Sequence, residues 1–352
     1  MPRLVALVHG MGVHPPGWSA AIQETLDQVS APYAFFDGAP FRTQVTFAEV
    51  AYDDVFVSQV STFAMTADAL EAFAQAQGVD IASTSTWLRH ASRTEQNFFW
   101  SHCVDVLLYR FFPSIREAAI ARVRTQLATA IARARQEGPT EVTVIAHSLG
   151  TAVAHDALHS LGSRAFDGSK AFKAGTFQLQ SLFMLANTSR CLETAPTVHQ
   201  SCVFPGTLGK GAYTEFYANV RHTLDPVPAV RPFGPAANWK PSRFVAIDTL
   251  DHIRDLNVHG FEHYLDHPLV HIPLLRRVFG GSAVTADEET RALKQYPLKP
   301  SPPCPDRVRQ MRDRYRQMVD LLAHNENPAA LIIAAAQFLA AAKEAQDACM
   351  GA

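Results

Sequence analysis

The amino-acid sequence predicts an α/β protein built on a doubly wound, mostly parallel sheet. Three runs of continuous apolar residues, at 4–8, 142–146 and 181–186, have the composition of parallel strands that helices cover on both faces. Helical patterns lie between the strand candidates along most of the chain, and this alternation is typical of a parallel sheet with crossover helices. The 352 residues are 47% hydrophobic and 10% aromatic, which excludes a disordered or collagen-like chain.

Each further element follows from its local pattern. Residues 43–50 alternate apolar with polar side chains and predict a strand nearer an edge of the sheet. Residues 216–220 and 244–247 repeat the buried-strand pattern more weakly, and several prolines between them predict an irregular surface excursion. Apolar residues recur at helical spacing in three segments, 18–28, 113–136 and 150–161.

Two segments interrupt this alternation and define the domain organisation. Residues 52–112 are rich in aromatic side chains, so we expect a partly helical cap inserted into a main domain of residues 1–296. A Pro-rich linker, residues 297–305, leads to a C-terminal helical extension, residues 306–352, that we expect to pack on the same domain. The arginines clustered at the start of this extension are interspersed with aspartates, which is typical of a solvated helix face rather than a phosphate site.

Charge and composition exclude several classes of partner. With 31 Lys and Arg against 33 Asp and Glu, the formal charge of −2 gives no electrostatic reason to expect binding to nucleic acid or to a membrane surface. The longest apolar stretch, residues 329–342, is shorter than the ~20 residues that a bilayer requires, so we expect no integral membrane association. Five dispersed cysteines without a CxxC pair predict a reducing compartment and hence a cytoplasmic protein.

The most specific functional signal is the sequence VTVIAHSLGTAVA at residues 142–154. It places Ser148 on a sharp turn between a buried strand and a helix, where only small residues two positions away, here Ala146 and Gly150, leave room for the strained backbone. Backbone N–H groups at the start of the helix favour the negative charge that develops during acyl transfer. The pattern therefore predicts Ser148 as a nucleophile, with a helix N-cap serine as the alternative.

Around this serine the chain resembles the α/β-hydrolase superfamily, in particular serine esterases and lipase-like members with A-H-S-L-G at the nucleophile. The resemblance covers roughly residues 3–275, and it departs from the common G-x-S-x-G pattern by one methyl group at Ala146. It implies a hydrolase-type sheet and a triad in the order serine, acid, histidine, and it requires no metal or organic cofactor.

The H-G-M-G sequence at residues 9–12 follows the first strand, where the same family has its oxyanion loop. The resemblance implies that the backbone N–H of Met11, or otherwise of Gly12, joins the N–H of Leu149 in holding the tetrahedral oxyanion. His14, near this loop, and Thr188 are weaker candidates for contacts with the substrate.

The acid of the triad is expected at the end of a later strand. Asp225 lies just beyond the strand at 216–220, in a D-P-V-P turn that resembles the acid-bearing loop of lipase-like hydrolases. Its alternatives are Asp248, Asp251 and Asp255, and an Asp-Pro pair also starts ordinary turns.

Four histidines at four-residue intervals follow: His259, His263, His267 and His271. The resemblance favours His259 as the base, because in the family the catalytic histidine precedes an aromatic-aliphatic start of a helix; His263 is the second candidate. The spacing also raises a metal site on one helical face, but Gly260 and Pro268 interrupt a continuous helix, so we expect no metal.

Together these residues predict a serine hydrolase that cleaves a carboxylic ester through an acyl-serine intermediate. The aromatic insertion favours an apolar, lipid-like substrate, and the partner is expected to be a small molecule. The same serine would also serve an amidase, a thioesterase or an acyltransferase, and a non-catalytic binding module of this fold remains the alternative from another class. The sequence does not indicate the oligomeric state.

Overall fold

The computed structural model describes residues 1–56, 58, 109, 113–163, 171–194, 196–225, 227–229, 231–251 and 258–296. Most of the expected cap, the Pro-rich linker and the C-terminal extension with its arginine cluster lie outside the described residues.

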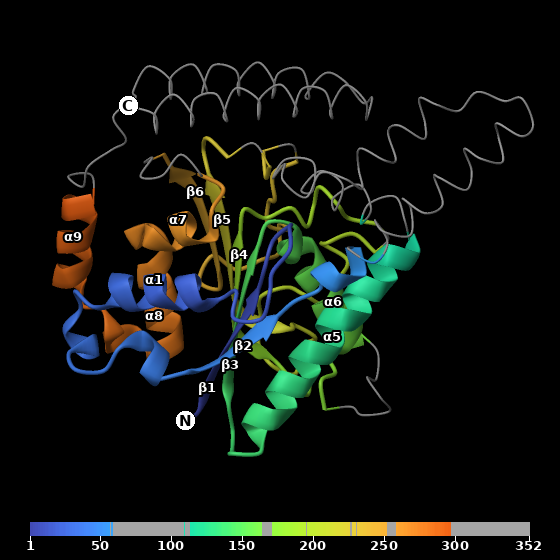
Figure 1. Ribbon diagram of the computed structural model, residues 1–352, viewed down its shortest axis with the longest axis horizontal. Helices are drawn as coiled ribbons and strands as arrows, with labels where there is room; N and C mark the ends of the chain where they lie inside the picture. Colours follow the sequence, from blue (N-terminus) through green and yellow to red (C-terminus); the bar gives the residue numbers. More distant parts are fainter. Residues whose placement is uncertain are drawn as a thin grey trace, which may run out of the picture.

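The centre of the protein is a six-stranded sheet in which neighbouring strands all pair in parallel, in the order β2-β1-β3-β4-β5-β6 (Figure 1). The strands are β1 (Arg3–Val8), β2 (Thr46–Val50), β3 (Glu141–His147), β4 (Leu179–Leu185), β5 (Thr214–His222) and β6 (Phe244–Leu250). The predicted α/β class is confirmed, and each of the six segments expected to be strands contributes one.

Helices cover both faces of the sheet (Figure 1). The described α-helices are α1 (Ala20–Ser30), α5 (Pro113–Arg135), α6 (Leu149–Ser163), α7 (Phe261–Asp266), α8 (Pro268–Phe279) and α9 (Ala286–Gln295). Short 3-10 turns occupy Ala34–Phe36, Phe41–Thr43 and Gly281–Ala283. Helices α5 and α6 pack side by side on one face, whereas α1, α7 and α8 lie on the other, as a doubly wound sheet requires.

The apolar core consists of two layers, one on each face of the sheet. In β1, for example, Leu4, Ala6 and Val8 face α5 and α6. Val5 and Leu7 face α1 and α8. Successive side chains of a strand point to opposite faces, so the continuous apolar run that predicted this strand supplies both layers.

The strand order changes direction at β1. The chain leaves β1 towards β2 on one side and later returns to β3 on the other, so the loops after β1 and β3 diverge at this point. In parallel α/β sheets such a switch point, at the carboxyl ends of the strands, is where ligands bind. The loop after β1 carries the H-G-M-G sequence, and the turn after β3 carries Ser148.

The start of the first helix differs from the expected one, whereas the break in the four-histidine segment lies where the sequence predicts it. The first helix begins at Ala20 rather than residue 18, because Gly17 adopts a φ of 85° in the preceding turn. The segment with four histidines forms two helices, which separate at an extended His267 because Pro268 begins the second one. Within the described ranges, no helix is long and apolar enough to cross a bilayer.

Candidate active site

The turn after β3 holds Ser148 in the left-handed region, with a φ of 53°. A residue with a side chain rarely adopts this conformation, so the surrounding contacts must hold it there. The Ser148 N–H donates to the Leu185 carbonyl oxygen at 3.0 Å, which continues the ladder between β3 and β4 into the turn. This is the strained strand-to-helix geometry that lifts a side chain above the end of a sheet.

Glycine is required where the loop after β1 meets this turn. A Cβ atom on Gly150 would lie 2.0 Å from the His9 carbonyl oxygen. A Cβ atom on Gly10 would lie 3.0 Å from both the Ser148 Cβ and the His147 Nδ1. The two segments therefore approach backbone to backbone, which only glycine permits.

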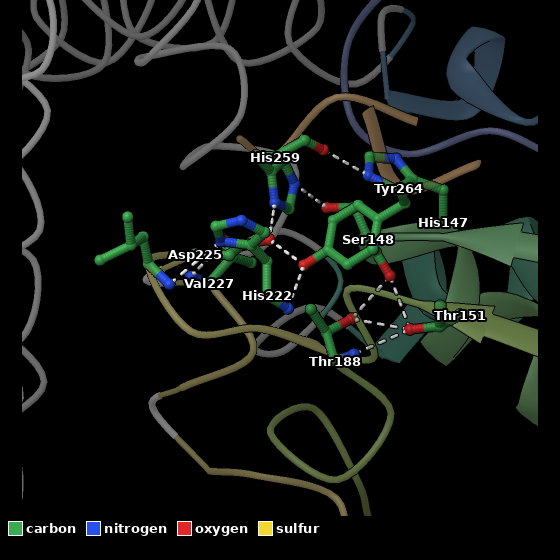
Figure 2. A network of polar contacts seen from close by, with 10 residues as sticks. His147, Ser148, Thr151, Thr188, His222, Asp225, Val227, His259 and Tyr264 are labelled. Carbon is green, nitrogen blue, oxygen red and sulfur yellow. Dashed lines mark hydrogen bonds and ion pairs between the residues drawn. The ribbon is translucent and has the colours of Figure 1, made fainter. Parts of the chain in front are cut away.

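The imidazole of His259 lies between Ser148 and Asp225 (Figure 2). Its Nε2 is 2.8 Å from the Ser148 Oγ, and its Nδ1 is 2.7 Å from the Asp225 Oδ2. The three residues come from the ends of β3 and β5 and from the turn before α7, and they meet because parallel strands all end at the same edge of the sheet. This arrangement can move a proton from the hydroxyl to the imidazole while the carboxylate holds the other ring nitrogen.

Asp225 is fully buried yet surrounded by hydrogen-bond donors. The Tyr264 hydroxyl donates to the same Oδ2 at 2.7 Å, and the Val227 N–H donates to Oδ1 at 3.0 Å. Burial alone raises the pKa of Asp225, but the charge of His259 and the hydrogen bonds from His259, Tyr264 and Val227 outweigh it and hold the pKa below its ordinary value. An ionised Asp225 accepts a hydrogen bond from Nδ1–H, which leaves Nε2 free to take the serine proton.

The buried contact with His259 distinguishes Asp225 from the other predicted acids that the structure describes. Asp248 is exposed and forms a 3.9 Å ion pair with Arg221, and Asp251 is also exposed. Asp255 lies outside the described residues.

Each of the other three histidines makes a contact elsewhere in the fold. His263 on α7 packs with its ring 5.3 Å from the ring of His222. His267 caps α8 by accepting the N–H of Leu269, and His271 on α8 donates to the Leu265 carbonyl oxygen. Within the described ranges, no cluster of three or more His, Cys, Asp or Glu side chains could hold a metal ion. The structure therefore brings His259, and not His263, to the serine.

His147 and Tyr264 belong to the site although the sequence analysis did not single them out. The His147 Nε2 donates to the His259 carbonyl oxygen at 2.6 Å, and its ring stacks on Phe261 with centroids 5.1 Å apart. Burial, followed by the charge of His259, lowers the pKa of His147 well below its usual value, so the ring is neutral. One sequence feature could have identified His147: it directly precedes Ser148, at the end of β3.

The two residues expected to supply oxyanion donors, Leu149 and Met11, are buried. Leu149 is the first residue of α6, so its N–H is one that a helix cannot satisfy internally. Among the described residues, neither the N–H of Leu149 nor that of Met11 has a hydrogen-bond acceptor. Gly12, the alternative donor, has a φ of 99°, and its carbonyl oxygen accepts a 2.9 Å hydrogen bond from the ring of His14.

The two expected substrate contacts, His14 and Thr188, take part in polar contacts within the fold. The His14 ring stacks on His9 at 3.9 Å, and burial, then the charge of His9, lowers the pKa of His14 to about 4. The buried Thr188 hydroxyl donates to the Ser148 carbonyl oxygen at 2.9 Å. A substrate contact by either residue stays a prediction.

Ser148 is fully buried, whereas 15% of the His259 side chain is exposed.

Comparison of the chain with models of known protein families finds no match, and comparison with curated proteins finds no significant relative.

Proposed function

We propose that this protein is a serine hydrolase of the α/β-hydrolase type that cleaves a carboxylic ester. The observation that carries the proposal is the continuous hydrogen-bonded chain from the Ser148 hydroxyl through His259 to Asp225, with contacts of 2.8 and 2.7 Å. The positive φ of Ser148 and the parallel sheet that brings the three segments together support it further.

The mechanism begins when His259 Nε2 removes the proton of Ser148 as its Oγ attacks the ester carbonyl carbon. The carbonyl oxygen becomes an oxyanion, and the backbone N–H groups of Leu149 and Met11 hold it. The imidazolium of His259 then gives its proton to the departing alkoxide, and the alcohol leaves an acyl-serine. Water, deprotonated by His259, attacks the acyl group and releases the acid and the free serine. Asp225 stays ionised throughout and stabilises the imidazolium.

The same steps cleave thioesters or amides, and transfer to an alcohol instead of water would make the protein an acyltransferase. We expect a small neutral ester, with a lipid-like acyl group as the favoured form. A substrate panel of esters, thioesters and anilides of equal acyl length tests this preference, and the ester is expected to give the highest kcat/KM.

The nucleophile is tested with a small fluorophosphonate probe, chosen because Ser148 is fully buried. We expect one probe per protein chain on Ser148, and loss of both labelling and p-nitrophenyl acetate hydrolysis in Ser148→Ala. Ser181→Ala is the matched control, because Ser181 is also buried but its hydroxyl contacts Thr143 within the sheet. A folded wild-type protein that neither labels nor hydrolyses any ester would make the protein a binding module instead.

A further inference from the structure

The carbonyl oxygen of Ser148 accepts an unusual number of hydrogen bonds. The Thr151 N–H reaches it at 2.9 Å, as at the start of any helix, and the Thr151 hydroxyl reaches it at 2.6 Å. The Thr188 hydroxyl adds a third bond at 2.9 Å from the loop after β4 (Figure 2). Two side-chain hydroxyls from separate elements therefore hold one backbone oxygen.

Thr188 is itself fixed in place. Its N–H donates to the Thr151 hydroxyl oxygen at 2.8 Å, and its side chain is 3% exposed. The loop that carries it leaves β4 through Ala186, whose φ is 49°, and the Ala186 N–H bonds to the Val220 carbonyl oxygen. The sheet thus sets the position of the Thr188 hydroxyl.

The held oxygen belongs to the peptide unit that contains the Leu149 N–H. In a planar trans peptide the C=O and N–H point in opposite directions, so fixing the carbonyl oxygen also fixes the direction of the N–H. Turning this peptide would break all three hydrogen bonds at once. Donors on the carbonyl oxygen also polarise the peptide and make its N–H a stronger donor.

The second expected oxyanion peptide, between Gly10 and Met11, is held in the same way. Its carbonyl oxygen accepts from His9 Nδ1 at 2.7 Å and from the Tyr52 hydroxyl at 2.9 Å, which shares its proton with the His9 carbonyl oxygen at 3.1 Å. A carbonyl oxygen can only accept, so His9 Nδ1 donates to Gly10, while His9 Nε2 accepts the Tyr52 N–H at 3.1 Å. The Met11 N–H therefore points away from Tyr52.

We propose that the hydroxyls of Thr188 and Tyr52 are positioning groups for the oxyanion hole, each holding the carbonyl oxygen of the peptide whose N–H binds the oxyanion. The inference rests on the proposed hydrolase function. It gives Thr188 a role behind the nucleophile, separate from the substrate contact that stays a prediction.

The test compares Thr188→Val, which keeps the shape but removes the hydroxyl, with Thr188→Ser, which keeps the hydroxyl. Tyr52→Phe removes the other hydroxyl. Each loss is expected to lower kcat about five- to tenfold, the equivalent of one hydrogen bond, with KM changed less than about twofold, because the oxyanion exists only after attack. The double variant should lose the product of the two factors, since the hydroxyls act on different donors.

Rates are expressed per active site by titration with the fluorophosphonate probe, so that a misfolded fraction does not count as a slow enzyme. Thr143→Val is the matched control, because it removes a buried threonine hydroxyl that bonds Ser181 inside the sheet. We expect unchanged kcat for this control and recovery of kcat in Thr188→Ser.

Two results would overturn the inference while leaving the proposed function intact: wild-type kcat in both Thr188→Val and Tyr52→Phe, or equal losses in kcat for Thr143→Val. An inactive wild-type protein would instead refute the proposed function. The two failures are therefore distinguishable.

Discussion

Adding one methyl group at Gly150 should separate the two backbone segments of the site. The Cβ of Gly150→Ala would lie 2.0 Å from the His9 carbonyl oxygen, whereas real Cβ contacts essentially never fall below 3.0 Å. The loop after β1 and the start of α6 must therefore move apart by about 1 Å, and a misplacement of this size costs on the order of 10²-fold in rate. The accompanying strain should cost about 1–3 kcal/mol of stability.

A series of glycine-to-alanine substitutions tests whether the loss of rate grows with the size of the displacement. Gly10→Ala would place its Cβ at 3.0 Å from two atoms, so a shift of a few tenths of an ångström suffices, and the rate should fall on the order of tenfold or less. Gly281→Ala is the control, because nothing lies within 4 Å of its Cβ position.

The assay is kcat/KM for p-nitrophenyl acetate per titrated active site, with thermal unfolding measured on the same samples. The expected order of loss is Gly281→Ala, then Gly10→Ala, then Gly150→Ala. Full activity in Gly150→Ala, or an equal loss in Gly281→Ala, would show that the close approach of the two segments has no part in the reaction.

Further predictions concern the residues around the imidazole. Asp225→Asn should lower kcat on the order of 10⁴-fold, because an amide can donate to Nδ1 and favour the wrong tautomer; near-normal turnover would exclude this acid. The folded-state pKa of Asp225 lies below its unfolded value, so its ionised form contributes stability that is complete above about pH 4 and is lost as pH falls through the folded pKa. Thermal unfolding of Asp225→Asn should therefore vary less with pH in this acidic range than that of the wild type. His259→Ala should abolish ester turnover, whereas His263→Ala should keep kcat per active site within about twofold, and the reverse result would exchange their roles. His147→Phe keeps a ring beside the site but loses the donor to the His259 carbonyl oxygen. The value of kcat should therefore fall about tenfold, while the extent of Ser148 labelling stays unchanged. If both kcat and the pH–rate profile stayed unchanged, His147 would not position His259.

The arrangement of polar groups explains how a strained site persists in this fold. The positive φ of Ser148 costs on the order of 1–3 kcal/mol, and no single contact offsets it. The ladder bond from Ser148 N–H to β4 and the hydroxyl contacts on its carbonyl oxygen hold the residue from both sides. Ser148 thus lies between a strand end and a helix start, which are more rigid than the turns that carry Asp225 and His259.

The sequence by itself determined the features that depend on near neighbours. Continuous apolar runs predicted three of the six strands, weaker runs two more, and alternation of apolar and polar residues the sixth, because the burial of a strand shows in consecutive residues. The small residues around Ser148 predicted its sharp turn, since the steric demand of that turn acts within two residues. The extents of the cap and of the C-terminal extension lie outside the described residues and stay predictions.

Only the tertiary structure decided the features that depend on segments distant in the chain. The sequence placed His259 first among four equally spaced histidines and left His263 as the second candidate, and the position of α7 against the sheet brings His259 to the serine. In the same way Tyr264 reaches Asp225, and Thr188 reaches the Ser148 carbonyl oxygen, because the loops after β3, β4 and β5 end at one edge. Such contacts depend on which strands pair and where the helices pack. The residues adjacent to each contact in the chain do not specify that pairing.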